Sequence, residues 1–395
     1  MIVCGIICEY NPFHRGHAYH IARARALSGA DYVVCAMSGP VVQRGVFARH
    51  DKRLRARMAL RSGADLVLEL PARFACAPAP EFAGGGVALL GSLGVVTHLS
   101  FGCEAEALPL LERAAGVLRE EPPAFRKALR EGLDRGLSYP RAQAEAAGAA
   151  LGEPDLAAAI AQPNAALALE YLRALPDGIR AMPIAREGAG YHDERLQPLS
   201  SASAVRAACA RGELREAMAA LPFPEGFERA ETSGFVHEEE ALTQALLYAL
   251  RTADAQALAS IRGMDEGLQN AFLSAAQTAS TRDALILAVK SKRHTYARLS
   301  RACAGVLLGL TKDFARENAA PAYARILGFR RSAKPLLHAI RRQSALPLIA
   351  KAADFDRRHP LFALDLRAQD LWSLGCTNPT LRQSCRDLTT GPVIL

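Results

Sequence analysis

The chain has 395 residues, half of them hydrophobic and 22% charged, with a formal net charge of +8. That length allows two domains of ordinary size, and the composition is typical of a soluble protein with a substantial core. The sequence opens with neither a basic leader nor a cleavage site, and no apolar run reaches the roughly 18 residues of a membrane span, so we expect a cytosolic protein.

Strand and helix signals alternate through the first hundred residues. Strands are expected at residues 2–8, 32–37, 65–70 and 95–101, and helices at 17–27, 51–61 and 81–90. Strands that are spaced by helices form βαβ units. This part of the chain therefore predicts a Rossmann-like α/β fold with a parallel sheet.

A helical stretch follows, from residue 108 to about 175, and Pro122, Pro140 and Pro163 interrupt its pattern. A last strand is expected at 181–185, with a helix opening near Ser200. After about residue 210 strand signals nearly vanish, and amphipathic helical segments take their place. We predict an α/β domain at 1–210 with a helical insertion at about 105–175, and a mostly α-helical domain at 211–395.

The strongest chemical signal is the stretch EYNPFHRGH, residues 9–17, directly after the first predicted strand. The carboxyl end of a strand in an open α/β sheet is where ligands bind, and a helix N-terminus favours phosphate. His14 and His17 are three residues apart, so in a first helical turn they project to the same side. Gly16 lets a phosphate approach the backbone. Two imidazoles placed in this way can donate hydrogen bonds to a triphosphate as charge develops on it.

Two other interpretations of these histidines stay open. They could be polar residues of a turn, as lone histidines usually are. The even spacing of His14, His17 and His20 could also hold zinc, for which Glu9 is the only further ligand nearby. The nine cysteines are scattered without a C-x-x-C pair, which favours buried thiols over a metal cluster or disulfides, and we predict no resident metal.

A second signal is the stretch LSSASAVR, residues 199–206, after the last predicted strand of the first domain. Ser201 at a helix start and Arg206 one to two turns later can hold outer phosphates and a leaving pyrophosphate. Alone, such serines are more often helix caps. Together with the H-x-G-H motif they favour a phosphate site.

The positive charge is concentrated in one region. Residues 281–350 hold 14 basic and three acidic side chains, a net +11, which leaves −3 for the rest of the chain. Such a concentration is expected of a surface that binds a polyanion. Five of these cations fall in one predicted helical segment and are the candidate RNA-binding residues: Lys290, Lys292, Arg293, Arg298 and Arg301.

H-x-G-H paired with a late S-S-x-S-x-x-R is typical of the HxGH nucleotidyltransferase superfamily, and the whole chain resembles its bacterial tRNA(Met) cytidine acetate ligase family. The matching stretches are GIICEYNPFHRGH (5–17), MSG (37–39), VQRG (42–45), DK (51–52), LSFGCE (99–104), QPN (162–164), GAGYHD (188–193), SKRHT (291–295) and YARILGF (323–329). Three departures stand out: Pro40, the segment VFARH (46–50) and His294 replace residues usual in the family. The first two bear on the acetate site.

The resemblance implies an enzyme that makes acetyl-adenylate from ATP and acetate, and then acetylates N4 of the wobble cytidine of elongator tRNA(Met). His14 and His17 would be its catalytic residues, with Mg²⁺ arriving on ATP. The implied ATP site comprises Ile7, Cys8, Glu9, Tyr10, Asn11, Pro12, Phe13, His14, Gly16, His17, His20, Gly102, Asn164 and Arg186, to which we add Ser201 and Arg206. Lys52 is expected either near the triphosphate or in solvent.

Two other functions remain possible. A related nucleotidyltransferase could make a nucleotide cofactor from a phosphorylated small molecule without RNA. A non-catalytic RNA-binding protein could use the same fold as a nucleotide sensor. Neither the sequence nor the resemblance indicates an obligate protein partner.

Overall fold

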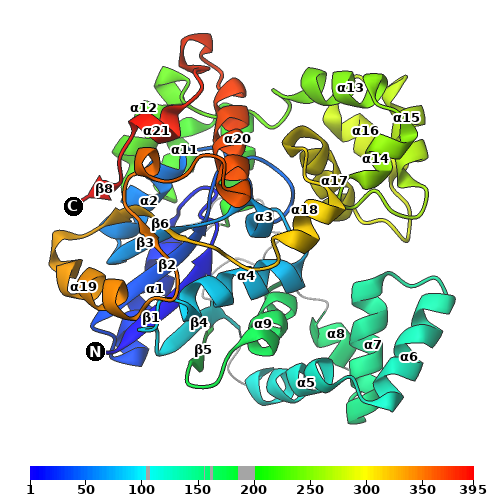
Figure 1. Cartoon of the computed structure of the whole chain (residues 1–395), viewed down its shortest axis with the longest axis horizontal. Coiled ribbons are helices and arrows are strands. Elements are labelled where there is room, and N and C mark those ends of the chain that lie inside the picture. Colours follow the sequence, from blue (N-terminus) through cyan, green and yellow to red (C-terminus); the bar gives the residue numbers. More distant parts are fainter. Residues whose placement is uncertain (104–106, 155, 161–162, 186–200) are drawn as a thin grey trace.

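A computed structural model of the chain describes residues 1–103, 107–154, 156–160, 163–185 and 201–395. Its centre is a sheet in which eight strands are described, in the order β5-β4-β1-β2-β3-β6-β7, with β8 paired to β6 (Figure 1). The strands of the first half are β1 (Val3–Cys8), β2 (Tyr32–Ser38), β3 (Leu66–Leu70), β4 (His98–Gly102) and β5 (Arg180–Ile184). All five run parallel, which confirms the parallel sheet expected from the alternating pattern.

Helices cover both faces of this sheet, because successive strand residues point to opposite sides. The helices between the first strands are α1 (Arg15–Ser28), α2 (Lys52–Arg61), α3 (Ala72–Ala75) and α4 (Ala79–Gly91). On β1, Val3 belongs to the core with α4, whereas Cys4 and Ile6 belong to the core with α1 and α2. Each fully buried Leu or Phe of these cores adds about 1.5–3 kcal/mol.

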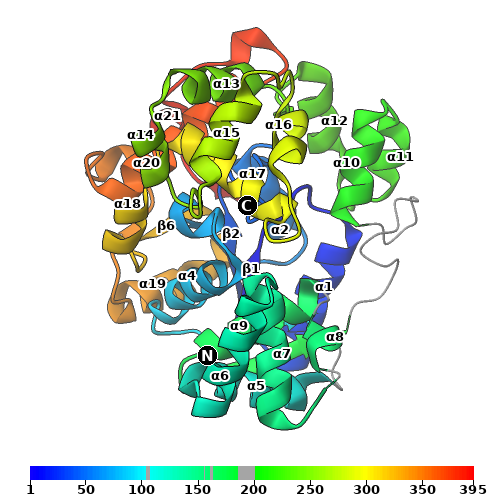
Figure 2. The same ribbon diagram turned by 90° about the vertical axis from the view of Figure 1, so that its right-hand side faces the viewer.

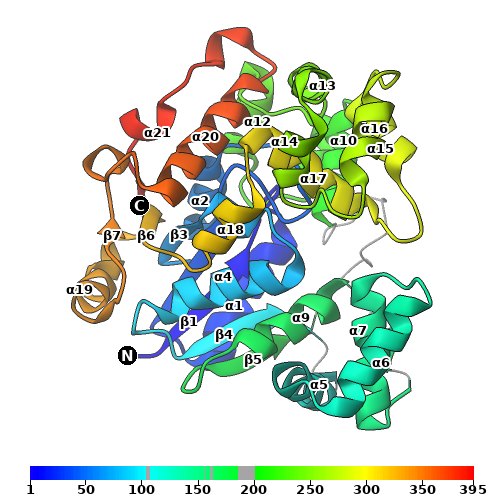
Figure 3. The same cartoon turned by 45° about the vertical axis from the view of Figure 1, so that its right-hand side comes forward.

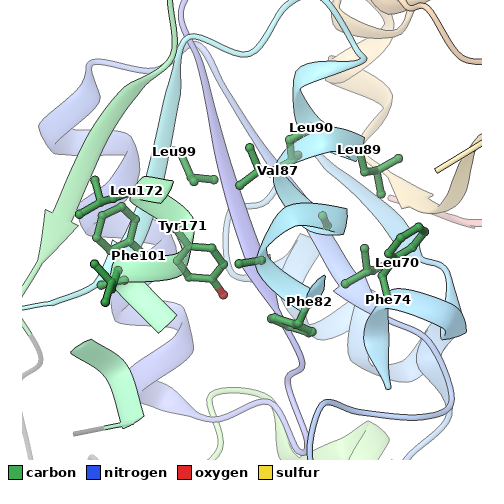
Figure 4. Packing of buried hydrophobic residues seen from close by; sticks show 14 of the residues in the cluster. Leu70, Phe74, Phe82, Val87, Leu89, Leu90, Leu99, Phe101, Tyr171 and Leu172 are labelled. Carbon is green, nitrogen blue, oxygen red and sulfur yellow. The ribbon is translucent and has the colours of Figure 1, made fainter. Parts of the chain in front are cut away.

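The core on the α4 face is continuous with the helical insertion (Figure 4). Phe101 of β4 lies against Tyr171, with ring centroids 5.7 Å apart, and Leu99 and Val87 pack nearby. The insertion consists of α5 (Leu108–Glu120), α6 (Pro123–Asp134), α7 (Tyr139–Leu151), α8 (Leu156–Ile160) and α9 (Pro163–Ala174). The prolines that interrupt the sequence pattern stand at or near the starts of α6, α7 and α9, where the missing N–H costs nothing.

The second half is predominantly helical, as predicted. Its helices are α10 (Ala202–Ala210), α11 (Leu214–Ala219), α12 (Pro224–Ser233), α13 (Thr243–Thr252), α14 (Ala255–Ser260), α15 (Leu268–Ala276), α16 (Arg282–Val289), α17 (Tyr296–Leu308), α18 (Lys312–Glu317), α19 (Lys334–Gln343), α20 (Pro360–Leu374) and α21 (Arg386–Thr389). Helices α13–α17 enclose a core of their own. Figure 2 shows this group above the insertion helices on one side of the molecule, and Figure 3 shows both groups beside the sheet.

Strands in the second half are a finding that the sequence pattern did not predict. β6 (Ala324–Phe329) pairs antiparallel with β3, and β7 (Leu348–Ile349) and β8 (Val393–Ile394) pair with β6. β6 lies within the stretch YARILGF (323–329). The strand is buried on both faces, so its sequence shows no alternation of apolar and polar residues. The expected division at residue 210 stays a prediction, but the sheet itself draws strands from both sides of it.

Within the described ranges, no helix is both long and apolar enough to cross a bilayer.

Candidate active site

The candidate site lies where the strand order reverses. β1 has β2, the next strand in the chain, on one side and β4 on the other. Both neighbours are parallel to β1, so the carboxyl ends of β1, β2 and β4 meet at one edge. Ligands of open α/β sheets bind at such a switch point. The H-x-G-H stretch leaves β1 at this edge, as expected from the sequence.

His14 and His17 open helix α1, and backbone N–H groups of the same turn fix the tautomer of each ring. His14 is the N-cap residue, and its Nδ1 accepts a hydrogen bond from the Gly16 N–H at 3.1 Å. The Nδ1 of His17 accepts one from the His14 N–H at 3.3 Å. A neutral imidazole that accepts at Nδ1 carries its hydrogen on Nε2. Each ring therefore presents an Nε2–H donor.

The two rings lie close together and tilted, with centroids 3.7 Å apart and planes inclined by 32°. Gly16 is required between them, because a Cβ at this position would lie 2.9 Å from Cε1 of His14. The sequence-based interpretation gave Gly16 a role toward phosphate; the structure adds that a side chain here would disturb the N-cap. Two Nε2–H groups beside a helix N-terminus form an arrangement suited to an anion.

His20 is held by the neighbouring strand. Its Nε2 lies 3.0 Å from Oγ of Ser100 on β4, a contact that joins α1 to the other side of the switch point. Across the part of the chain that the structure describes, no three His, Cys, Asp or Glu side chains gather in a way that would hold a metal ion. The zinc interpretation therefore finds no ligand set among these residues.

Tyr10 and Phe13 form the support beneath His17. Their ring centroids lie 4.8 and 5.5 Å from that of His17, and both side chains are buried. The Tyr10 hydroxyl is 3.6 Å from Sγ of Cys35. Tyr10 and Phe13, which the resemblance places in the ATP site, thus pack beneath the candidate site with their side chains buried.

Asn11 links the motif to two other segments. Its Oδ1 accepts a hydrogen bond from the Arg49 N–H at 2.9 Å, and its backbone carbonyl accepts one from the Arg206 guanidinium. Ser201 caps α10 by accepting from the Ala204 N–H at 3.2 Å. The structure therefore brings the serine motif and the histidine motif together through Arg206, as expected from their pairing in the sequence.

Glu9 is held in place by a backbone N–H of the segment between β2 and α2. Its Oε1 accepts a hydrogen bond from the Gln43 N–H at 2.7 Å. Burial raises the pKa of Glu9, and the Gln43 hydrogen bond and the charges of Arg206 and Arg44 partly offset that effect. The carboxylate is a partly buried acceptor just after β1, and its hydrogen bond to the turn that carries Gln43 determines where it lies.

Arg55 was missed by the sequence analysis. Fully buried on α2, it donates to the carbonyls of Glu9 at 2.7 Å, Ser38 at 3.0 Å and His50 at 3.0 Å, and so ties the ends of β1 and β2 together. Nothing in the sequence separates this arginine from Arg53 and Arg57 on the same helix. Only its position toward the sheet marks it.

Lys52 contradicts both expectations made for it. Its side chain is buried, and Nζ lies 2.6 Å from Oε1 of Glu69 and 2.7 Å from Oδ2 of Asp387. Arg325 lies 3.0 Å from the other Glu69 oxygen and 2.8 Å from Asp387. The lysine is therefore neither solvated nor available for a triphosphate, because both carboxylates hold it inside a structural ion network.

The remaining expected ATP-site residues are spread around the switch point. Cys8 is buried, and its Sγ lies 3.8 Å from the Ala36 carbonyl. Partly buried Ile7 packs against the α4 face, Pro12 follows a cis peptide bond, Gly102 ends β4, and Asn164 lies in the first turn of α9. Arg186 lies outside the described residues.

The five candidate RNA-binding cations do not share one helical segment, which corrects the expectation. Lys290 caps the end of α16, Lys292 and Arg293 lie in the connection, and Arg298 and Arg301 lie on α17. The helix is interrupted because Thr295 starts a new one by capping it. Arg293 pairs with Glu266 at 3.1 Å, whereas Arg301 donates to the Gln43 carbonyl at 3.3 Å.

Comparisons with known proteins cover the whole chain. The family model described as HIGH Nucleotidyl Transferase matches residues 1–387. A tRNA(Met) cytidine acetate ligase of Acetivibrio thermocellus is 34% identical over the full length of both chains. One of Syntrophomonas wolfei is 35% identical over all of this chain and 99% of the relative.

Solved structures agree with these matches. A crystal structure of Thermotoga maritima TmcAL bound with alpha-thio ATP superposes with a TM-score of 0.93 at 32% identity, and covers all of both chains. The apo form of that protein gives 0.94 at the same identity and coverage. The chain therefore belongs to the tRNA(Met) cytidine acetate ligase family of HIGH nucleotidyltransferases.

Proposed function

We propose that this protein is an ATP-dependent ligase that adenylates acetate and transfers the acetyl group to N4 of the wobble cytidine of elongator tRNA(Met). The observation that carries the proposal is the pair of adjacent imidazoles, each accepting a backbone N–H at Nδ1, at the switch point of the sheet. Membership of the family and a similar structure bound with an ATP analogue support the same function. We expect the protein to acetylate tRNA in the cytoplasm.

In the first step an acetate oxygen attacks the α-phosphorus of ATP and the bond to the bridging oxygen breaks, which gives acetyl-adenylate and pyrophosphate. Negative charge grows on the departing pyrophosphate, and the Nε2–H groups of His14 and His17 are suited to stabilise it. Arg206, fixed beside the motif through Asn11, adds positive charge. Mg²⁺ would be held largely by the phosphates and water, as is usual for this ion.

In the second step N4 of cytidine attacks the acetyl carbon, AMP leaves, and the amine loses a proton. The base must be unstacked to reach the adenylate. We propose that residues 211–395 supply the RNA surface, with the exposed side chains of Lys290, Lys292 and Arg293 at its centre. Contacts of this kind give affinity and salt dependence without sequence readout.

One experiment separates this function from its alternatives. Purified protein is assayed for acetate-dependent exchange of labelled pyrophosphate into ATP, and then for acetyl transfer from labelled acetate to tRNA. We expect both activities. Exchange that requires a phosphorylated small molecule instead of acetate would indicate a cofactor-forming nucleotidyltransferase. Binding of tRNA without any exchange would indicate a non-catalytic RNA-binding protein.

A further inference from the structure

The turn at residues 41–47, between β2 and α2, joins the end of β1 to the basic helix α17. Val41 and Phe47 form an antiparallel bridge across it, and the Gly45 N–H donates to the Val42 carbonyl at 2.9 Å. The Gln43 N–H holds the Glu9 carboxylate. The turn is thus a tight, hydrogen-bonded unit that contacts the site on one side.

On its other side the turn accepts hydrogen bonds from two arginines and a serine of the second half of the chain. Nη2 of Arg282 and Oγ of Ser300 both donate to the Gly45 carbonyl, each at 3.1 Å, and the two side chains also bond to one another. Arg301 donates to the Gln43 carbonyl at 3.3 Å. Arg282 and Ser300 are 6% and 1% exposed, which leaves little surface for a ligand of RNA size.

The backbones themselves are in close contact. Gly45 has a φ of +75°, and a Cβ on it would lie 2.4 Å from the backbone nitrogen of Arg301. Only glycine allows α17 to approach the turn this closely. The contact is therefore built into the fold and does not depend on the side chains alone.

We infer that Arg282, Ser300 and Arg301 are positioning residues of the adenylation site, which hold the 41–47 turn so that Gln43 fixes the Glu9 carboxylate beside the H-x-G-H motif. This inference rests on the proposed function and deepens it. It also removes Arg301 from the set of candidate RNA-binding residues, since its guanidinium donates to the turn. Helix α17 thereby belongs to the catalytic centre as well as to the basic region.

The consequence for catalysis follows from the charge of Glu9. Without the Gln43 N–H, this carboxylate is free to move at the edge where anionic acetate and ATP must meet. Misplacement by about 1 Å near a reacting centre costs up to about a hundredfold in rate. ATP itself is expected at the start of α1, whose histidine contacts do not involve the turn.

The test compares Arg301→Ala and Arg301→Lys with wild type in two assays. For Arg301→Ala we expect kcat of tRNA-free, acetate-dependent exchange to fall about tenfold while KM for ATP changes less than about twofold. Arg301→Lys keeps a donor for the Gln43 carbonyl and should recover part of the rate. The slope of log tRNA affinity against log salt should be unchanged in both variants.

Arg316→Ala is the matched control, because this exposed arginine of the same basic segment pairs with Asp313 and does not contact the turn. It should leave exchange at the wild-type level. If Arg301→Ala fails to fold, Ser300→Ala removes one bond to Gly45 without changing charge, and exchange should fall about threefold.

Unchanged exchange in Arg301→Ala, or in Ser300→Ala where that variant replaces it, would overturn the inference. A salt slope lower by about one would do the same, because it would make Arg301 a phosphate ligand. A wild-type protein without acetate-dependent exchange would contradict the proposed function itself. The two failures are therefore distinguishable.

Discussion

At the scale of single residues, the chemistry depends on which nitrogen of each histidine carries the hydrogen. The capping contacts at the start of α1 occupy Nδ1 of both rings with backbone N–H groups. The local fold of the chain thus determines which nitrogen of each ring carries the hydrogen before any ligand arrives. A preorganised donor of this kind is typically worth about 3–4 kcal/mol in the transition state.

Replacement of His17 tests this role. His17→Ala removes one Nε2–H donor, and we expect acetate-dependent pyrophosphate exchange to fall at least about tenfold. Binding of tRNA should stay at the wild-type level, since the residue lies at the switch point. Exchange kinetics and a filter-binding assay measure the two effects.

His98→Ala is a suitable control, because this histidine opens β4 and therefore lies at the opposite end of the sheet. It should leave exchange unchanged. Equal exchange in His17→Ala and wild type would remove His17 from the mechanism.

Single residues also show the limits of the sequence. His14 and His17 were predictable because their spacing, the preceding strand and the glycine agree. Lys52 and Arg55 were not, because a charged residue at a helix start usually lies in solvent. Here Lys52 meets buried carboxylates from β3 and α21, and Arg55 meets four carbonyls. Those partners are set by long-range packing, which no local pattern encodes.

At the scale of elements, the segment before α2 is fastened to α12 by a buried carboxylate. The Glu231 carboxylate accepts two hydrogen bonds from the Arg49 guanidinium and one from Nε2 of His50, at 2.6 to 2.9 Å. Burial alone would raise the pKa of Glu231, but these hydrogen bonds lower it to about 2. Arg49 and His50 belong to the VFARH segment, which this contact fastens to α12.

This cluster predicts a pH dependence of stability. Because the folded pKa of Glu231 lies below its ordinary value of 4.5, the stabilisation is complete above pH 4.5 and is lost as the pH falls toward 2. Glu231→Gln should abolish a contribution on the order of 3 kcal/mol. Urea unfolding between pH 2 and 7 measures it as the difference between wild type and variant.

The exposed Glu228 of the same helix provides the comparison, since Glu228→Gln should follow the wild-type curve. A constant difference between wild type and Glu231→Gln over the whole range would show that the ionised carboxylate is not what stabilises this contact.

The connection between α16 and α17 carries two exposed cations whose contribution to tRNA binding can be tested. Lys292→Ala combined with Arg293→Ala should weaken tRNA binding and lower the salt slope by about 1.5 to 2. The loss of Arg293 also leaves Glu266 without its partner, which adds repulsion toward phosphate. Affinity measured over a series of salt concentrations checks this.

The adjacent exposed pair Arg126 and Lys127 on α6 provides a matched double replacement, which should leave the slope unchanged. Similar slopes for the Lys292/Arg293 variant and wild type would place the RNA surface elsewhere on the molecule.

At the scale of the whole molecule, the end of the chain completes the sheet that its beginning starts. β6 and β8 extend the sheet beyond β3, and Asp387 of α21 joins Lys52, Glu69 and Arg325 in the buried ion network. Burial would raise the pKa of Asp387, but the charges of Lys52 and Arg325 hold it well below its usual range. Buried ion pairs and strand pairing thus join the two halves of the chain at this edge.

Asp387→Ala should destabilise the protein by about 3–5 kcal/mol, because it leaves two buried cations without a full counter-charge. Chemical unfolding of the full chain measures the loss. Asp356→Ala removes an exposed carboxylate and should change the free energy of unfolding by less than about 0.5 kcal/mol. An equally small effect of Asp387→Ala would show that the network is not needed for the fold.

Much of the architecture was open to prediction from local patterns, and one part of it was not. β1 to β5 and the helices α1, α2 and α4 lie close to their expected ranges, because alternating βαβ segments constrain one another; the short helix α3 was not predicted. β6 was not predicted, because a buried strand of six residues among helices has no periodicity that distinguishes it from a helix. Its antiparallel pairing with β3 is a tertiary choice, and it explains why the predicted division near residue 210 does not divide the sheet.

The central claim is that the His14 and His17 rings receive the polyphosphate of ATP. A crystal structure of the protein with a non-hydrolysable ATP analogue tests it most directly. We expect phosphate oxygens within about 3.2 Å of Nε2 of both rings. Phosphates bound away from both rings, with the analogue otherwise well ordered, would contradict the account.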